Sequence, residues 1–229
     1  MDSAAHGASS SSPSDNHTVV TLQPKGRRSD EYKLILDSGA SFLVHRSAVA
    51  QAGLYEGITI DGLELDRLIR ETELLHAREK ALDLVARREH SRRELEQKLR
   101  RKRFPEDAVR SALDELEQRG ILDDHRFARL WTETRLRRRP EGRVQVIAGL
   151  VQRGVAREVA ERCVAEVYEQ RTALVNDALR RAAERAWRAA GCSFEPAVRR
   201  LVRRGFGFGE SRDAIARLSN LEKNDFYLE

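Results

Sequence analysis

Cysteine is scarce in this chain of 229 residues, and the two that occur, Cys163 and Cys192, are too few for a disulfide scaffold. Two cysteines fit a reducing compartment, so we expect a cytoplasmic protein. No apolar run approaches the ~20 residues that a membrane-spanning helix needs. The N-terminus has no basic start followed by an apolar stretch. The sequence therefore predicts neither a membrane span nor a secretory signal.

Signatures of catalysis and of metal binding are also missing. The six histidines and two cysteines show no metal-ligand spacing. The glycine-rich stretch 205–209 has no following lysine and precedes no strand–helix–strand unit, so it does not match a phosphate-binding loop. No nucleophile–base pair is evident from spacing. We therefore expect no catalytic residue, no metal ion and no cofactor, and a protein that is not an enzyme.

Charge is what the chain has in abundance. Asp, Glu, Lys and Arg make up 34% of the residues, and the net charge is +5. The balance is −4 over residues 1–75, +6 over residues 76–139 and +3 over residues 140–229. A basic region of this kind favours a polyanionic partner or an acidic protein surface. For any single arginine, a solvated helix face is an equally good interpretation.

One pattern occurs three times at a fixed spacing of 51 residues, without gaps. Equivalent positions include Ser91/Gly142/Ser193, Leu99/Leu150/Leu201, Phe104/Val155/Phe206, Ala112/Cys163/Ala214 and Leu116/Val167/Leu218. A fixed period indicates one supersecondary unit used three times, each copy stacking its apolar face on the next. Such stacks are elongated and curved, and they usually bind other macromolecules.

The predicted fold is mainly α: three tandem three-helix repeats in a curved, elongated array, with a small N-terminal segment that contains a β-hairpin. Each repeat is predicted to hold one long and two shorter helices. The second repeat should have helices at 123–139, 142–153 and 156–170, and the third at 171–190, 194–204 and 210–220. The predicted parts are a disordered tail at 1–17, a β-containing segment at 18–62, repeats at 63–121, 122–170 and 171–220, and a loose tail at 221–229.

Strand signals are confined to residues 18–60. The apolar runs Tyr32–Leu36 and Ser41–His45 flank an Asp/Gly turn and predict a hairpin. Further β-prone runs are Thr18–Leu22 and Ile58–Ile60, and a short helix is expected at 46–52 before Gly53. A two- or three-stranded sheet is marginal alone, so we expect it to pack on neighbouring helices.

Helix boundaries are marked by polar and glycine residues. Ser91 and Glu94 fit a capping box, and Gly120 fits a helix C-terminus. Asp123 and Asp124 precede the next helix; they fit an N-cap better than a contact to a basic partner.

The run from Ala86 to Phe104, Ala-Arg-Arg-Glu-His-Ser-Arg-Arg-Glu-Leu-x-x-Lys-Leu and then Phe, resembles the RecX family of recombinase regulators. The likeness continues through Leu113-x-x-Leu-x-x-x-Gly-Ile-Leu-Asp-Asp-x-x-Phe-Ala128 and, more weakly, through Arg203-Arg-Gly-Phe206. It covers roughly residues 72–220. In the second repeat, Arg138-Arg-Pro-Glu-Gly142 departs from the basic turn that the family pattern leads us to expect.

The resemblance implies a helical three-repeat protein that binds in the groove of the RecA–single-stranded DNA filament. It implies negative regulation of filament growth, strand exchange, ATP hydrolysis and RecA-stimulated repressor cleavage. We expect a monomer with no membrane association. A general single-stranded nucleic-acid-binding helical protein is the alternative. A helical nuclease is a third hypothesis, although no carboxylate cluster lies on one helix face with metal-site character.

Three basic groups are the candidate contacts to the RecA filament or to DNA, because the planar fork of arginine binds phosphate and carboxylate bidentately. They are Lys98, Arg100, Arg101, Lys102 and Arg103; Arg135, Arg137, Arg138 and Arg139; and Arg199, Arg200, Arg203 and Arg204. The competing interpretation is that many of them pair with glutamates at helical spacing, as Lys98 would with Glu94.

We expect structural rather than binding roles for several aromatic residues and for one histidine. Phe127 and Trp131 lie four residues apart and should share a buried helix face, and Trp187 aligns with apolar stripe positions. We therefore expect Trp187 in a core rather than stacked on a base. His90, at a helix junction, is expected to pack or to cap.

Overall fold

The structure is a computed structural model that describes residues 16–26 and 29–226, with side chains described as far as Asn220. Most of the predicted N-terminal tail, residues 1–15, lies outside the described residues. Asn16 and His17 begin strand β1 (Asn16–Pro24), so the tail prediction of 1–17 is wrong for these two residues. Their polar side chains carry no strand signal; they are in the sheet because their backbone pairs with Asp61 and Ile60.

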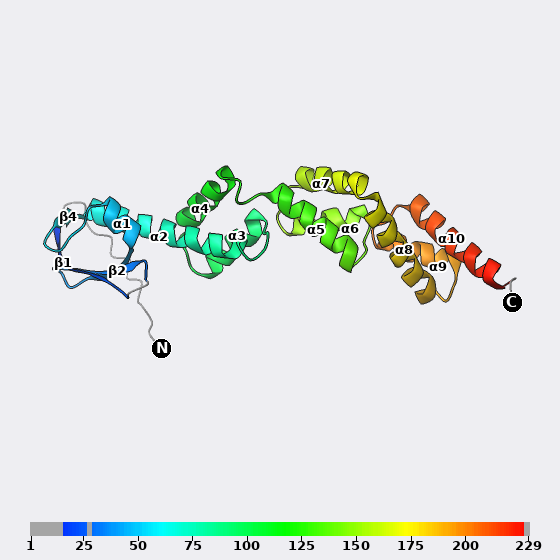
Figure 1. Ribbon diagram of the computed structural model, residues 1–229, viewed down its shortest axis with the longest axis horizontal. Helices are drawn as coiled ribbons and strands as arrows, with labels where there is room; N and C mark the ends of the chain where they lie inside the picture. Colours follow the sequence, from blue (N-terminus) through cyan, green and yellow to red (C-terminus); the bar gives the residue numbers. More distant parts are fainter. Residues whose placement is uncertain (1–15, 27–28, 227–229) are drawn as a thin grey trace. The chain divides into compact units, whose positions relative to one another are not determined.

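The N-terminal sheet has four antiparallel strands in the order β3-β2-β1-β4. Figure 1 labels β1, β2 and β4 in this unit. The strands β2 (Glu31–Leu36) and β3 (Ser41–His45) form the predicted hairpin. The expectation of two or three strands is wrong, because the first residues of β1 pair with β4 (Thr59–Asp61) and its later residues pair with β2.

Two helices cover this sheet, as its marginal size requires. The short helix α1 (Arg46–Gln51) follows β3, and the long helix α2 (Gly62–Val85) follows β4. The shared apolar core is formed by Val19, Leu34, Leu36, Val44, Ala48, Ile60, Leu65, Leu68 and Leu75. The sheet is therefore the hydrophobic partner of the first half of α2.

Eight further helices account for most of the remaining chain. They are α3 (Arg92–Arg101), α4 (Glu106–Gln118), α5 (Asp124–Arg138), α6 (Arg143–Gln152), α7 (Arg157–Gln170), α8 (Thr172–Ala189), α9 (Phe194–Arg203) and α10 (Phe208–Phe226). Within the described residues, no helix is long and apolar enough to cross a membrane.

The last helix differs from its predicted limits of 210–220. It begins at Phe208 because the Glu210 carboxylate accepts a hydrogen bond from the Gly207 N–H at 3.0 Å, which satisfies a backbone donor at the helix start. It continues to Phe226 because no Gly or Pro interrupts the sequence after Asn220. The backbone of residues 221–226 is helical, and residues 227–229 lie outside the described part, so the predicted loose tail of 221–229 stays a prediction.

The chain forms two compact units. The N-terminal unit is Met1–Asp83 with Leu99–Glu115, and the C-terminal unit is Leu84–Lys98 with Leu116–Glu229. Helices of the predicted first repeat contribute to both units. The repeat boundaries read from the sequence therefore stay a prediction.

Separate apolar clusters support the second and third predicted repeats. In the second, α5, α6 and α7 meet through Phe127, Ala128, Leu136, Val146, Leu150, Val155, Cys163, Val164 and Val167. In the third, α8, α9 and α10 meet through Ala182, Ala183, Trp187, Ala197, Val198, Leu201, Phe206 and Ile215. The core position of Trp187 is confirmed, and Trp131 is partly buried against the second cluster.

The turn after the middle helix has the same backbone shape in all three repeats. Arg103, Gly154 and Gly205 are spaced by 51 residues, and their φ angles are +65°, +89° and +85°. Left-handed backbone is strained for any residue with a Cβ, so glycine suits the second and third copies. Arg103 adopts the same left-handed conformation although it has a Cβ, so its backbone is strained.

Arg103→Gly is expected to raise the free energy of unfolding by about 1 kcal/mol, because it relieves left-handed strain at a cost in unfolded-chain entropy. Chemical denaturation of the purified protein measures this. Arg110→Gly, in the exposed interior of α4, is the matched control and should lower stability by about 1 kcal/mol. Equal losses from both variants would contradict the assignment of strain to Arg103.

Candidate partner-binding surface

The three basic groups lie mostly in the last turn of a helix or just beyond it. The first ends α3, the second ends α5, and the third runs through the second half of α9. Cations near a helix C-terminus are stabilised by the helix dipole, typically by about 0.3–1 kcal/mol each. Position alone therefore gives these residues a structural role, and their partners decide which of them are available to another molecule.

Two buried carboxylates pair with most members of the second group. Glu133 is only 8% exposed and lies 3.5 Å from Arg137 and 3.3 Å from Arg171. Glu141 is 9% exposed and binds Arg135 at 2.8 Å and Arg139 at 3.3 Å. Three of the four arginines in the densest basic run therefore have a carboxylate partner.

The members of this second group still differ in availability. Arg135 is partly buried and lies over the Trp131 ring at 5.3 Å, which makes it structural. Arg137 and Arg139 are exposed, and exposed ion pairs contribute little and exchange readily. Arg138 is exposed and has no side-chain partner among the described residues.

The first group divides in a similar way. Lys98 places its Nζ 2.8 Å from His90 Nε2, so the expected Lys98–Glu94 pair is wrong. Arg100 pairs with Glu106 at 2.6 Å. The three residues that follow, Arg101, Lys102 and Arg103, are exposed, and no side-chain partner is found for them in the described part of the chain.

The third group has one structural member. Arg204 donates from Nη2 to the Pro140 carbonyl at 2.9 Å and so ties the third repeat to the second. Arg199 has only a long hydrogen bond of 3.4 Å to the Glu195 carbonyl on its own helix. Arg200 and Arg203 are exposed, without side-chain partners among the residues described.

The available cations can now be stated for each unit separately. In the N-terminal unit they are Arg101, Lys102 and Arg103, and in the C-terminal unit they are Arg138, Arg199, Arg200 and Arg203. The remaining candidates hold neighbouring helices together or pair with glutamates. We define these seven residues as the available cations.

The C-terminal unit contains two junctions between consecutive repeats. Equivalent residues of the repeats form a hydrogen bond across each junction. Ser91 Oγ donates to the Arg153 carbonyl at 2.6 Å, and the Gly142 N–H donates to the Arg204 carbonyl at 2.9 Å. These two pairs are related by the 51-residue spacing. In each junction, the start of one middle helix meets the end of the next.

Glycine allows the close approach at both junctions. A Cβ on Gly142 would overlap the carbonyl of Gly205 and the backbone nitrogen of Phe206. A Cβ on Gly205 would lie 2.7 Å from the backbone nitrogen of Gln145, and one on Gly154 would overlap the Arg93 side chain. Backbone-to-backbone contact therefore fixes how α9 meets α6.

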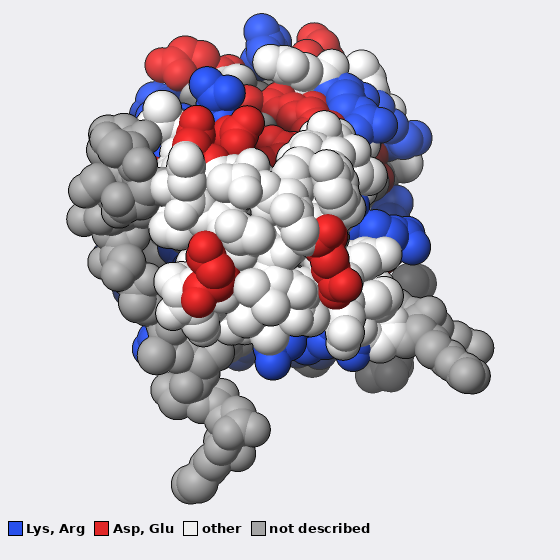
Figure 2. All heavy atoms as spheres, turned by 90° about the vertical axis from the view of Figure 1, so that its left-hand side faces the viewer, with Lys and Arg blue, Asp and Glu red and all other residues white. Residues whose placement is uncertain are grey.

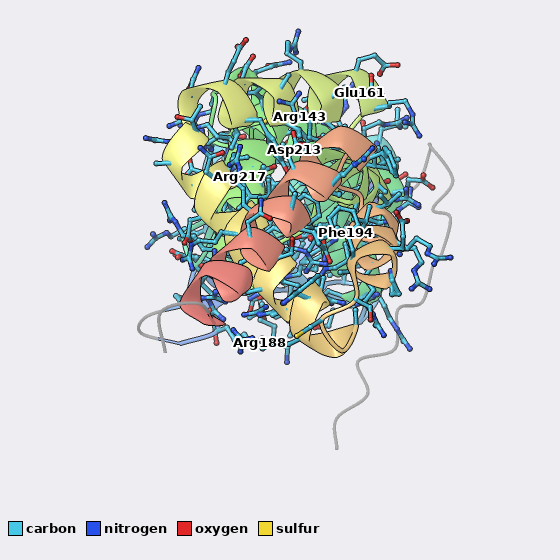
Figure 3. The ribbon with its side chains drawn as sticks, turned by 90° about the vertical axis from the view of Figure 1, so that its right-hand side faces the viewer. Arg143, Glu161, Arg188, Phe194, Asp213 and Arg217 are labelled. Carbon is cyan, nitrogen blue, oxygen red and sulfur yellow. The ribbon has the colours of Figure 1, made fainter. Side chains whose placement is uncertain are left out.

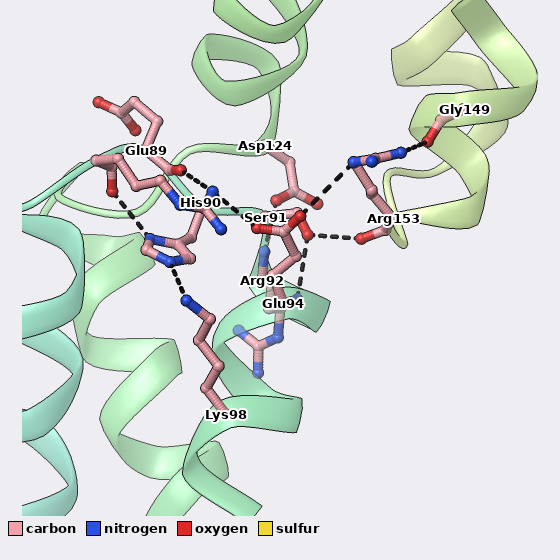
Figure 4. Close-up of polar contacts among 10 residues, drawn as sticks. Glu89, His90, Ser91, Arg92, Glu94, Lys98, Asp124, Gly149 and Arg153 are labelled. Atoms are coloured by element: carbon pink, nitrogen blue, oxygen red, sulfur yellow. Dashed lines mark hydrogen bonds and ion pairs between the residues drawn. The ribbon is translucent and has the colours of Figure 1, made fainter.

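The first junction is also held by a polar network, shown in Figure 4. Asp124 accepts the backbone N–H of Arg92 at 2.8 Å and so caps the start of α3 from another helix. Burial raises the pKa of Asp124. Arg153 lies over the Trp131 ring at 4.7 Å and donates to the Gly149 carbonyl at 2.9 Å.

The predicted helix caps are confirmed in part. Ser91 Oγ accepts the Glu94 N–H at 3.1 Å, as expected for one arm of a capping box. The Glu94 carboxylate binds Arg88 at 3.0 Å, and this pairing replaces the second arm. Asp123 caps α5 by accepting the N–H groups of His125 and Arg126, as predicted.

His90 is buried and structural, in agreement with its predicted role. Its Nδ1 lies 2.9 Å from the Arg88 carbonyl, and Lys98 donates to its Nε2 (Figure 4). These partners require a neutral ring with the proton on Nδ1. Burial lowers the pKa of His90, and the nearby Arg88 cation lowers it further.

Stability is therefore expected to fall as the pH falls below the ordinary histidine pKa of about 6.5. The unfolded chain binds a proton there that folded His90 resists, so ΔG of unfolding rises with pH through this window. Denaturant unfolding at pH 7.5 and pH 5.5 measures the effect. His90→Gln should reduce the pH dependence relative to the wild type; an unchanged pH dependence would exclude His90 as the cause.

The described residues offer no cluster typical of a metal site. No three His, Cys, Asp or Glu side chains in the described part gather as a metal-binding group. Burial raises the pKa of Cys163 to about 11, so this thiol stays protonated at neutral pH. The prediction that the protein is not an enzyme stays a prediction.

The N-terminal unit presents a different kind of surface. Figure 2 views its sheet end, where uncharged residues cover the middle of the face and carboxylates gather above them. Exposed apolar side chains in this unit are Val20, Leu43, Tyr55 and Leu63. A cleft of about 650 Å³, lined by α1, β4, α2 and α4, has mixed charges that include Arg67, Glu71 and Asp107.

Sequence reasoning missed two features that the structure brings out. Arg181 donates to the carbonyls of Leu136 and Arg137 at 2.9 and 2.7 Å and so caps the end of α5 from α8. Phe208 is 63% exposed at the start of α10. Its repeat-equivalent residues are Glu106 and Arg157, both exposed, and this alignment could have identified the position as a surface one.

Comparison with known proteins gives a consistent result. The model of the first three-helix domain of RecX matches residues 77–116, and that of the second matches residues 123–164. The regulatory protein RecX of Chlorobaculum tepidum is 31% identical over 139 residues, which cover 59% of this chain and 83% of that protein. The RecX of Clostridium acetobutylicum is 25% identical over 141 residues, covering 62% of this chain and 65% of the relative, slightly less than two thirds of its length.

Solved structures agree in fold. A crystal structure of regulatory protein RecX matches with a TM-score of 0.68 and 20% identity, covering 85% of this chain and 96% of that one. The RecX crystal structure from Lactobacillus salivarius matches with a TM-score of 0.54 and 19% identity, covering 65% and 97%. At these identities the likeness establishes the fold.

Proposed function

Because the chain belongs to the RecX family of regulatory proteins, we propose that it binds the RecA–single-stranded DNA filament and restrains RecA. The restrained activities are filament growth, ATP hydrolysis, strand exchange and RecA-stimulated repressor cleavage. The protein acts by binding, without chemistry of its own.

The available cations are the observation that carries this proposal. Within the three basic groups, seven exposed Lys and Arg side chains lack a carboxylate partner among the described residues, three in the N-terminal unit and four in the C-terminal unit. A filament of protein on single-stranded DNA presents phosphates and acidic side chains to such groups. Each contact is weak in water, but several on one chain raise the total affinity by an effective-concentration effect.

Binding to assembled filaments is tested by co-sedimentation. RecA filaments are formed on single-stranded DNA with a non-hydrolysable ATP analogue, and the protein should sediment with them at near-physiological salt. RecA without DNA and DNA without RecA are the controls. Failure to sediment with the complete filament would contradict the proposal.

General binding of single-stranded nucleic acid is the second candidate, favoured by the same cations. Binding driven by phosphates weakens steeply with salt. A salt titration on single-stranded DNA alone therefore separates the two functions. Equal affinity for bare DNA and for the filament would favour the general binder.

A further inference from the structure

The third repeat differs from the second in the surface of its middle helix. Helix α9 has Arg199, Arg200 and Arg203 where the equivalent positions of α6 hold Ala148, Gly149 and Gln152. In α6, packing favours glycine at position 149, because a Cβ there would lie 2.6 Å from Cη2 of Trp131. The first repeat holds Gln97, Lys98 and Arg101 at the equivalent positions, so only the third repeat has arginine at all three.

These arginines lie opposite the buried face of α9. Ala197, Val198 and Leu201 are buried against α8 and α10, whereas Arg199, Arg200 and Arg203 are exposed. Arg199 and Arg203 are one helical turn apart, as are Arg200 and Arg203. Because no described carboxylate neutralises them, this face has an unmatched positive charge.

An exposed aromatic ring follows directly on this cationic helix. Phe206 enters the core at 5% exposure, whereas Phe208, two residues later, is 63% exposed. The backbone at Phe208 is ordered, because Gly207 bonds to Glu210 at 3.0 Å and accepts the Ser211 N–H at 3.0 Å. The next residue is open as well, because a Cβ on Gly209 would meet no atom within 4 Å.

The platform that carries these groups is firmly held. The Arg204 side chain bonds to Pro140, and the Arg204 carbonyl accepts the Gly142 N–H, so the end of α9 is fixed on the second repeat. Figure 3 looks onto α8, α9 and α10 of the third repeat, with Phe194 on α9 and Asp213 and Arg217 on α10. A rigid platform loses little conformational entropy when a ligand binds.

We infer that Phe208, Arg199, Arg200 and Arg203 form a binding site for single-stranded nucleic acid. The arginines bind backbone phosphates, and the Phe208 ring stacks on an unpaired base. Aromatic platforms beside cationic grooves are the usual means of holding single strands, because a base stacked within a duplex has no free face to offer. The inference rests on the proposed function in one respect: in the complex with the RecA filament, the third repeat would contact the single-stranded DNA.

The test uses the full chain without RecA. Fluorescence anisotropy follows its binding to labelled oligothymidine and to an abasic oligonucleotide of the same length and charge. The wild type should bind oligothymidine more tightly than the abasic strand. Phe208→Ala should weaken oligothymidine binding roughly 5- to 100-fold and should barely change abasic binding.

Matched variants separate stacking from other effects. Tyr55→Ala removes an equally exposed ring, 62% exposed, from the N-terminal unit and should leave binding unchanged. Phe208→Trp should retain tight binding. Arg199→Ala with Arg203→Ala should reduce the slope of log affinity against log salt by about 1.4, since each phosphate contact to a single strand contributes about 0.7.

The inference is overturned if the wild type does not bind oligothymidine. It is also overturned if Phe208→Ala binds oligothymidine as the wild type does, or if the abasic strand binds equally well. The latter result would indicate a purely ionic surface or one for an acidic protein. Since RecA is absent from this assay, its outcome is independent of whether the protein restrains RecA.

Discussion

Gly142→Ala is expected to destabilise the C-terminal unit by about 3 kcal/mol, a large effect for one added methyl group. Gly142 has φ −77°, which alanine adopts freely, so backbone strain is not the cause. The cause is overlap of the new Cβ with the backbone of Gly205 and Phe206. Backbone atoms cannot rotate away as a flexible side chain can, so the junction between α6 and α9 must open.

Gly209→Ala is the matched control for this prediction. It makes the same substitution in α10, at a residue where a Cβ meets no atom within 4 Å and φ is not positive. It should be neutral or stabilise the protein by up to about 1 kcal/mol. Denaturant unfolding measures both variants. A loss in Gly142→Ala no larger than in Gly209→Ala would show that the repeats do not meet through this backbone contact.

Reversing the available cations is expected to have the largest functional effect. Arg200→Glu with Arg203→Glu should raise the protein concentration that half-inhibits RecA roughly 100-fold, because favourable contacts become repulsive ones. These side chains are exposed and unpaired within the described residues, so the variant should fold, with a loss of at most about 2 kcal/mol from the reversed charge at the C-terminus of α9. Inhibition of DNA-dependent ATP hydrolysis by RecA is the measurement, with circular dichroism as the check on folding.

Arg162→Glu with Arg185→Glu is the control for net charge. Both residues are exposed, on α7 and α8, and lie outside the three basic groups. The double variant changes the total charge equally and should retain most of the inhibition. If both double variants lose inhibition equally, net charge rather than a particular surface controls binding.

The second basic group is a poorer target for the same experiment. Reversing Arg137 or Arg139 would place a carboxylate beside buried Glu133 or Glu141. Loss of inhibition would then mix lost binding with lost stability. The choice of variants thus depends on the ion pairs that the structure shows.

The helices were predictable from the sequence because their apolar positions repeat with a fixed period. The apolar sets at 99, 150 and 201, and at 116, 167 and 218, mark positions that pack within each repeat. Gly154 and Gly205 have the same spacing in the sequence, and their left-handed backbone explains why both are glycine. Local periodicity and local turns are thus readable without coordinates.

Contacts between distant residues were not predictable in this way. The pairing of Asn16 with Asp61 depends on where the chain returns after α1, and two polar residues give no sign of it. The choice of partner for Lys98, His90 rather than Glu94, depends on side-chain directions that spacing does not give. Which arginines are paired and which are available could not be predicted for the same reason. Glu133 and Glu141 belong to no repeating pattern in the sequence, so their ion pairs with arginines are seen only in the structure.

One measurement tests the central claim most directly: the rate of DNA-dependent ATP hydrolysis by RecA, followed while this protein is added at a few per cent of the RecA concentration. A regulator that restrains filament growth lowers the rate at such substoichiometric amounts, and Arg200→Glu with Arg203→Glu blunts the effect. An unchanged rate across a wide range of concentrations, at low and at near-physiological salt, would contradict the proposed function.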